Sequence, residues 1–256
     1  MPAQVMAKKA SKMLNTSKKF WYAIATLVGS TVGVGIYGIP FAFQKAGFGI
    51  GFLFLMGMGG LILLSNLLYG EVILRTHERH QFIGYTHKYL GFWARKINLF
   101  TFILGAYGGL IGVIIISGGF LVNSFSFLFR FSSLTWSTLF VLATAILIFK
   151  GLRTISRIDL VMMVIFASVV LLIGFLGMDM IEKSNYTFAV KDFWFLPFGI
   201  VMFALSSKPG IPLARGVLGS SEDKLKNVLI LGTVIPVVLY LVFALVIVGI
   251  SGDATS

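Results

Sequence analysis

The feature that most constrains this chain is an apolar segment, residues 20–43, that carries four glycines and a proline near its middle. A run of this length predicts a transmembrane helix, because about 20 apolar residues cross the hydrocarbon core. Glycine and proline weaken a helix interior. Irregular backbone at membrane depth is tolerated only where it is buried in protein or lines a watery cavity. Broken helices of this kind carry the binding sites of secondary transporters, so we expect function at residues 29–40.

The composition predicts an integral membrane protein. Hydrophobic residues make up 57% of the chain, charged residues 12%, and the mean hydropathy is +0.95. The absence of cysteine excludes disulfides and thiol catalysis. His77, His80 and His87 share one polar loop without a set of acidic ligands, so we expect no metal site, and no cofactor or enzyme motif is apparent. The net charge of +12 suits an anionic membrane surface better than nucleic acid.

Seven apolar segments are long enough, or nearly so, to cross a membrane as helices. They cover residues 20–43, 48–74, 97–129, 133–149, 158–181, 193–214 and 225–250. The predicted fold class is therefore an all-α polytopic membrane protein with seven transmembrane helices. Ser156, followed three residues later by Asp159, predicts a capping box at the start of the fifth helix.

Basic residues indicate the orientation. The N-terminal tail and the alternate loops hold 16 lysines and arginines, whereas the opposite loops hold only Lys45, Arg130, Lys183 and Lys191. Because basic loops stay in the cytoplasm, we expect a cytoplasmic N-terminus and an external C-terminus in the plasma membrane.

A second interruption falls in the sixth segment, where residues 203–212 contain two prolines, a glycine, two serines and Lys208. The first and sixth segments are five helices apart and enter the membrane from opposite sides. Paired breaks at corresponding positions of two inverted repeats are typical of a transporter site. This divides the chain into a basic tail (1–19), a first five-helix repeat (20–182) and a partial second repeat (183–256).

These residues resemble a known family. Residues 29–35 with Pro40, the runs 70–76 and 84–91, and the break at 203–212 are similar to the amino acid–polyamine–organocation superfamily, in its aromatic amino acid permease and amino acid/auxin permease branch. The resemblance implies the leucine-transporter fold, two inverted five-helix repeats with helices one and six unwound around the substrate. That fold needs ten core helices, so we expect a C-terminally truncated permease lacking helices 8–10.

The substrate site is expected at the two breaks. A helix that begins within the membrane presents unpaired N–H groups and a positive dipole end, which suit a carboxylate. Carbonyls of the sixth helix suit the ammonium group. In the fold that the chain resembles, an aromatic residue caps the site; Phe203 is the candidate, with core packing as the alternative. The candidate substrate residues are Ser30, Thr31, Gly33, Val34, Gly35, Tyr107, Phe203, Ala204, Leu205 and Ser206.

Four residues are candidates for ion coupling. The resemblance implies half of a sodium site at the carbonyls of Gly29 and Val32. Lys208 lies inside a span and is either a tethered or titrating cation or a snorkelling side chain. Glu71 suits an ion pair with Arg75 four residues later, or a proton relay. Proton coupling is favoured over sodium because the similar branch often uses it.

The sequence thus predicts a secondary transporter for aromatic or large neutral amino acids, and not an enzyme. Two alternatives stay open: a truncated membrane module acting as a partner or sensor, and a seven-helix retinal or receptor protein. The expected partners are an amino acid and the lipid bilayer, without nucleic acid, and a homo-oligomer is left open.

Overall fold

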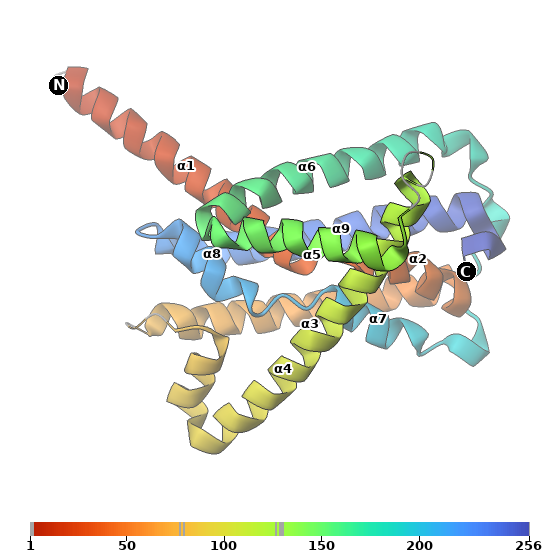
Figure 1. Ribbon diagram of the computed structural model, residues 1–256, viewed down its shortest axis with the longest axis horizontal. Helices are drawn as coiled ribbons and strands as arrows, with labels where there is room; N and C mark the ends of the chain where they lie inside the picture. The colour runs from red at the N-terminus through yellow and green to blue at the C-terminus, as the bar shows by residue number, and fades with distance from the viewer. Residues whose placement is uncertain (1–2, 77, 79, 126, 128–130, 256) are drawn as a thin grey trace. The chain divides into compact units, whose positions relative to one another are not determined.

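The computed structural model describes residues 3–76, 78, 80–125, 127 and 131–255, with backbone alone for 3–16, 153, 253 and 254. His77, Arg79 and Arg130, which entered the metal and orientation arguments, lie outside these ranges. Every regular element within them is helical. The α-helices, labelled in Figure 1, are α1 (Ala3–Thr31), α2 (Gly35–Ala46), α3 (Phe48–Arg75), α4 (Phe82–Phe125), α5 (Ser133–Phe149), α6 (Leu152–Leu176), α7 (Leu196–Ala204), α8 (Gly210–Leu218) and α9 (Leu225–Ser251). The 3₁₀ helices are η1 (Met178–Met180), η2 (Lys183–Asn185), η3 (Lys191–Phe193), η4 (Glu222–Lys224) and η5 (Gly252–Thr255).

Each of the seven predicted apolar segments contains helix within its described residues, which confirms the fold class of an all-α polytopic membrane protein. Within the described ranges, four helices are long and apolar enough to cross a membrane alone, and α1 with α2 would form a fifth as a bent span. The helices of the fourth and sixth predicted segments are too short for this length criterion: α5 has 17 residues, and α7 and α8 have nine each. Length alone therefore gives fewer spans than the predicted seven.

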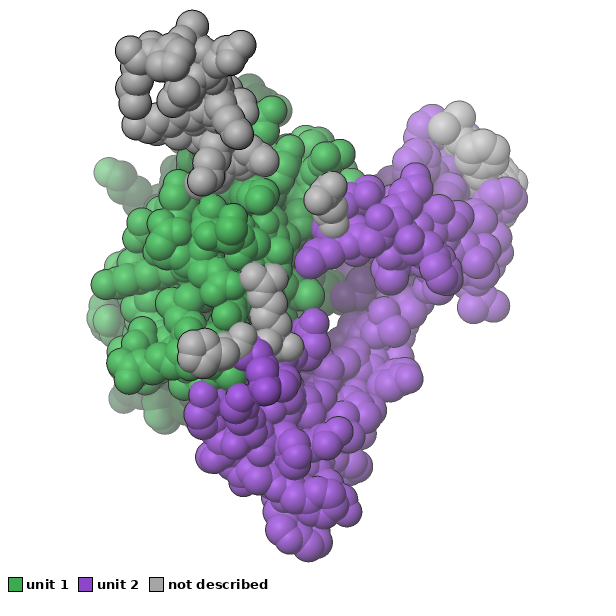
Figure 2. Space-filling model, turned by 90° about the vertical axis from the view of Figure 1, so that its left-hand side faces the viewer, with its two compact units in different colours: residues 1–77, 156–256 green, residues 78–155 purple. Residues whose placement is uncertain are grey.

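The chain divides into two compact units, coloured separately in Figure 2. Residues 78–155 form one unit, in which α4 packs on α5. Residues 1–77 and 156–256 form the other, which contains both predicted breaks. This partition follows packing within the chain, so the predicted boundaries of the repeats remain a prediction.

The core of the larger unit lies where α2, α3, α7 and α9 meet. Its fully buried side chains include Phe43, Leu55 and Tyr240. Around it, α1 packs on α8 and α9, while α2 packs on α7 and α9. The two broken segments are therefore in contact along both halves, and α9 supports each of them.

The turn between α2 and α3 shows why glycine is required at one position. Gly47 has a φ of 91°, which side chains rarely adopt, and a Cβ there would lie 2.6 Å from the Cα of Ala189. On either side of it, Phe48 N donates to Thr187 O and Val190 N donates to Ala46 O. Glycine thus lets the segment before α7 pair with the α2–α3 turn and fixes this end of the unit.

Candidate functional site

The first predicted break is present. Helix α1 ends at Thr31 and α2 begins at Gly35, with a bend of 57° between them. The first backbone bonds of α2 run from Ile36 N to Gly33 O and from Tyr37 N to Val34 O. The amides of residues 33–35 therefore precede the bonded part of α2, at the positive end of its dipole.

The second predicted break is also present. Helix α7 ends at Ala204 and α8 begins at Gly210. Residue Lys208 precedes Pro209, and the residue before a proline is disfavoured in a helix. Pro209 is the N-cap of α8, and Pro212 lies in its first turn, where the missing N–H costs little. The prolines therefore favour the start of α8 at this point, whereas α7 has already ended five residues before Pro209.

The two breaks meet through very close backbone packing. A Cβ at Gly35 would lie 2.8 Å from the Cα of Ala204 and 3.3 Å from the ring of Phe203. On the other half, a Cβ at Gly210 would collide with the hydroxyl of Ser30. Small residues at these crossings allow the half-helices to touch, as is usual where membrane helices pack.

Tyr240 of α9 joins the ends of the two half-helices. Its side chain is fully buried, and its hydroxyl lies 3.1 Å from Thr31 O and 3.0 Å from Ala204 O. Because a phenol has one proton, the two carbonyls share a single donor. The negative ends of α1 and α7 are thus held within reach of one oxygen, close to the first turn of α2. Positive and negative helix ends so arranged match the two charged groups of an amino acid.

A buried polar cluster lies beside the second break. Asn66 of α3 is fully buried, and its Nδ2 lies 3.4 Å from Ser207 Oγ and 3.1 Å from Thr233 Oγ1. Its Oδ1 has no hydrogen-bond partner among the described atoms. The cluster ties the α7–α8 connection to α3 and α9, and it leaves one strong acceptor unused.

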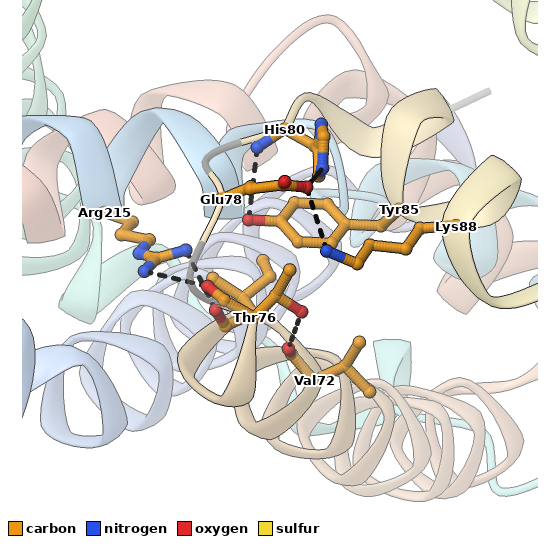
Figure 3. Close-up of polar contacts among 8 residues, drawn as sticks. Val72, Thr76, Glu78, His80, Tyr85, Lys88 and Arg215 are labelled. Atoms are coloured by element: carbon orange, nitrogen blue, oxygen red, sulfur yellow. Dashed lines mark hydrogen bonds and ion pairs between the residues drawn. The ribbon is translucent and has the colours of Figure 1, made fainter.

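Arg215 fastens α8 to the end of α3, as Figure 3 shows. It is 5% exposed, donates to Ile73 O at 2.9 Å and Thr76 O at 3.4 Å, and forms a 2.9 Å ion pair with Glu222. Cations are favourable at the carbonyl end of a helix, so this arginine both caps α3 and holds α8 against it.

The same view shows a separate set of polar contacts in the smaller unit. Glu78 accepts from Lys88 at 2.9 Å and lies 3.1 Å from His80 Nε2 (Figure 3). The hydrogen bonds from Lys88 and His80 hold the pKa of Glu78 below its ordinary value. His80 therefore has an acidic partner, although that carboxylate is already bound by a lysine.

Comparison with known proteins identifies the family of this chain. Residues 16–254 match the tryptophan/tyrosine permease family. The chain belongs to this family. It is also similar to the tyrosine-specific transport system 2 of Haemophilus influenzae, with 25% identity over 230 residues, which cover 88% of this chain and 56% of that protein. The chain thus spans little more than half of that relative's length. No solved structure gives a significant match.

Most of the predicted substrate residues of this permease lie at the breaks. Ser30, Gly33, Phe203 and Ser206 are exposed there, while Thr31, Ala204 and Leu205 are buried. Tyr107 belongs to α4 of the smaller unit and is 64% exposed. The structure therefore brings the residues of the larger unit together at the breaks, while the place of Tyr107 at the substrate site stays a prediction, as do the roles of all these residues.

The ion-coupling candidates differ in their surroundings. Gly29 and Val32 lie at the end of α1, and Lys208 is exposed in the second break. The predicted ion pair of Glu71 with Arg75 is confirmed, at 2.7 Å, between exposed side chains. The predicted capping box is wrong: α6 begins at Leu152, so Ser156 and Asp159 lie inside the helix. Their side chains face α1, where Thr26 Oγ1 donates to Ser156 Oγ.

The sequence argument missed Tyr240, Asn66 and Arg215. Tyr240 and Asn66 are isolated polar groups within the apolar runs 225–250 and 48–74, and such groups in a membrane span are expected to have a partner or a function. That signal was available. Arg215 gave no comparable signal, because it was counted among the loop charges.

Proposed function

We propose that this permease chain forms the substrate-binding part of a proton-coupled symporter for aromatic or large neutral amino acids, working by alternating access. The observation that carries the proposal is the meeting of the two breaks, with Tyr240 within hydrogen-bond reach of Thr31 O and Ala204 O. Membership in the tryptophan/tyrosine permease family and the similarity to a tyrosine-specific transport system support the substrate class. The family also favours this hypothesis over a seven-helix receptor.

In the proposed mechanism, the amides of Gly33, Val34 and Gly35 hold the substrate carboxylate at the first turn of α2. Glycine allows the carboxylate to approach the backbone closely. The ammonium group is held by carbonyls at the end of α7, and exposed Phe203 covers the substrate side chain. We infer that the chain supplies the first seven spans of a leucine-transporter-like fold, without helices 8–10 and with a cytoplasmic N-terminus. In such a fold, broken helices carry the substrate site near the midplane of the bilayer.

Replacement of Gly33 tests the proposal. No atom lies within 4 Å of a Cβ at Gly33, so Gly33→Leu is compatible with folding, but the new side chain fills the space assigned to the carboxylate. Gly57→Leu on α3 is a matched control, since its Cβ also meets nothing within 4 Å. We expect Gly33→Leu to abolish tyrosine and tryptophan binding in lipid nanodiscs, with unchanged thermal unfolding, and Gly57→Leu to bind as the unmodified chain does. Equal binding by the two variants would remove α2 from the site.

Uptake into liposomes separates the proposal from the alternative of a non-transporting module. Substrate accumulation by the reconstituted chain supports a symporter. Binding in nanodiscs without uptake by the same preparation would instead favour a binding module.

A further inference from the structure

A hollow on the surface of the larger unit, between α1 and α6, is not used by the mechanism above. Its volume is about 240 Å³. It is lined by Ser17, Lys18, Trp21 and Tyr22 of α1 and by Leu160 of α6. All five residues belong to the same compact unit, so the hollow is a feature of that unit alone.

One end of the lining is polar and lies where α1 begins its membrane span. Ser17 is the first residue of the bent span that α1 forms with α2, and Lys18 follows it. Both side chains are exposed. The serine hydroxyl can donate a hydrogen bond, and the lysine ammonium group has three donors and a positive charge. This end of the hollow therefore suits an anion at the level of the lipid head groups.

The other end of the lining is apolar. Leu160 is the seventh residue of the span Thr154–Leu176, so it lies about 9 Å along its helix from the start of that span. Trp21 is 47% exposed, and Tyr22 is half-buried. Tryptophan and tyrosine are enriched at membrane–water interfaces because each has an apolar ring and a polar tip. The hollow thus passes from polar to apolar, as the head group and first acyl carbons of a phospholipid do.

Among the described side chains, no acidic group neutralises Lys18. It takes part in none of the ion pairs found there. Asp159, which precedes Leu160 in sequence, faces Gly29 instead, since a Cβ at Gly29 would lie 3.0 Å from its Cγ. Gly29 is 11 residues beyond Lys18, about 16 Å along α1. The charge of Lys18 is therefore available to a ligand.

Two further lysines make the potential around this part of α1 more positive. The Nζ of Lys19 is 3.7 Å from where a Cβ at Gly219 would lie, just after α8. The Nζ of Lys224 lies 5.7 Å from the centre of the Phe20 ring. Clustered charges of one sign raise the local concentration of their counter-ions, and lysines near a membrane surface attract anionic lipids. The surroundings therefore favour an anionic lipid over a zwitterionic one.

We propose that this hollow binds the head group of one anionic phospholipid. Lys18 binds the phosphate, and the hydroxyl groups of Ser17 and Tyr22 donate to its oxygens. Trp21 and Leu160 pack against the glycerol and the start of an acyl chain, which a soluble phosphate ester lacks. The site depends on the predicted membrane insertion of α1 and α6, and it is independent of the symporter function proposed above.

Tryptophan fluorescence measures lipid contact at the hollow itself. A reporter form keeps Trp21 and has phenylalanine in place of the other tryptophans, Trp93, Trp136 and Trp194. In nanodiscs of phosphatidylcholine and phosphatidylglycerol, one lipid or the other carries a quenching spin label near the carboxyl end of an acyl chain, at equal labelled content. We expect a preference of about fivefold for phosphatidylglycerol at Trp21, as one lysine near a membrane surface gives. Equal quenching by the two lipids, or quenching by neither, would overturn the proposal.

Substitutions in the reporter form separate the hollow from general surface charge. Lys18→Gln should bring the preference close to parity, whereas Lys226→Gln, exposed at the start of α9, should keep it. Leu160→Phe should also lower the preference, because it narrows the hollow without changing the charge; Val161→Phe, at an exposed position, should not. Thermal unfolding checks that each variant is folded. Equal losses in the two lysine variants, or an unchanged preference in Leu160→Phe, would overturn the site.

Glycerol phosphate distinguishes a lipid from a soluble phosphate ester. Added to the same nanodiscs at constant ionic strength, it should leave the quenching by labelled phosphatidylglycerol unchanged, because it has no acyl chain to pack against Leu160. Loss of quenching on its addition would make the hollow a site for a soluble anion and would overturn the proposal.

Discussion

Removing one hydroxyl group, in Tyr240→Phe, tests whether α9 holds the two half-helices together. The ring stays and continues to fill the core, so the change removes the proton shared by Thr31 O and Ala204 O together with the oxygen that accepts from the backbone N–H of Gly33. Those carbonyls are the unpaired ends of two helices, and the site excludes water around the fully buried ring.

The expected loss in the free energy of unfolding follows from the single hydrogen-bond donor that the two carbonyls share. Interhelical hydrogen bonds in membrane proteins contribute from about 0.6 to about 2 kcal/mol. Leaving a buried acceptor unsatisfied costs about 1–3 kcal/mol. With one proton for two acceptors, we expect Tyr240→Phe to lower the free energy of unfolding by about 1–2 kcal/mol. Weaker positioning of the helix ends should raise the Kd for tyrosine up to about tenfold, since 1.4 kcal/mol corresponds to one decade.

Tyr186→Phe is a matched control. Its hydroxyl also donates to a carbonyl of α9, Leu245 O at 2.8 Å, but this contact is solvent-exposed and involves neither break. Equilibrium unfolding in mixed micelles measures both variants, and tyrosine binding is measured in nanodiscs. We expect a loss of less than about 0.5 kcal/mol for the control. If Tyr240→Phe matches the unmodified protein, or if both variants lose the same amount, Tyr240 does not hold the breaks together.

Three further predictions concern packing, the α3 cap and pH. Gly35→Ala should cost about 1–3 kcal/mol because its Cβ would lie 2.8 Å from the α7 backbone, whereas Gly33→Ala should change stability by less than about 0.5 kcal/mol; equal unfolding curves would contradict this. Arg215→Ala should lower the free energy of unfolding by about 3 kcal/mol, because it uncaps α3 and leaves the partly buried carboxylate of Glu222 without its ion pair. Arg75→Ala, which breaks an exposed ion pair, should lower it by less than about 0.5 kcal/mol in the same assay. Because the pKa of Glu78 is lowered in the folded state, its contacts should stabilise the protein at pH values above its ordinary pKa of 4.5, and this stabilisation should be lost as the pH falls below that value. A Glu78→Gln variant with the same free energy of unfolding as the unmodified protein at neutral pH would refute this.

Much of the fold was predictable from local composition. Apolar runs long enough for the membrane located each helical segment, and glycine or proline near residues 33 and 209 located both breaks, because each effect acts on the backbone of its own residue. The errors were at boundaries and in side-chain roles. Ser156 and Asp159 resemble a helix cap in sequence, yet they lie inside α6, since the helix continues back to Leu152 and their partners are on α1.

The sequence by itself determined the membrane class, the helical segments and the positions of the two interruptions, because these depend on hydrophobicity and backbone preference within a short window. Only the tertiary structure decided which polar groups become hydrogen-bond partners between distant helices. Tyr240 reaches Thr31 across 209 residues, Arg215 reaches Ile73 across 142, and Ser156 reaches Thr26 across 130. Such pairs form only when distant helices pack, and in a membrane each buried polar group must find its partner within the protein.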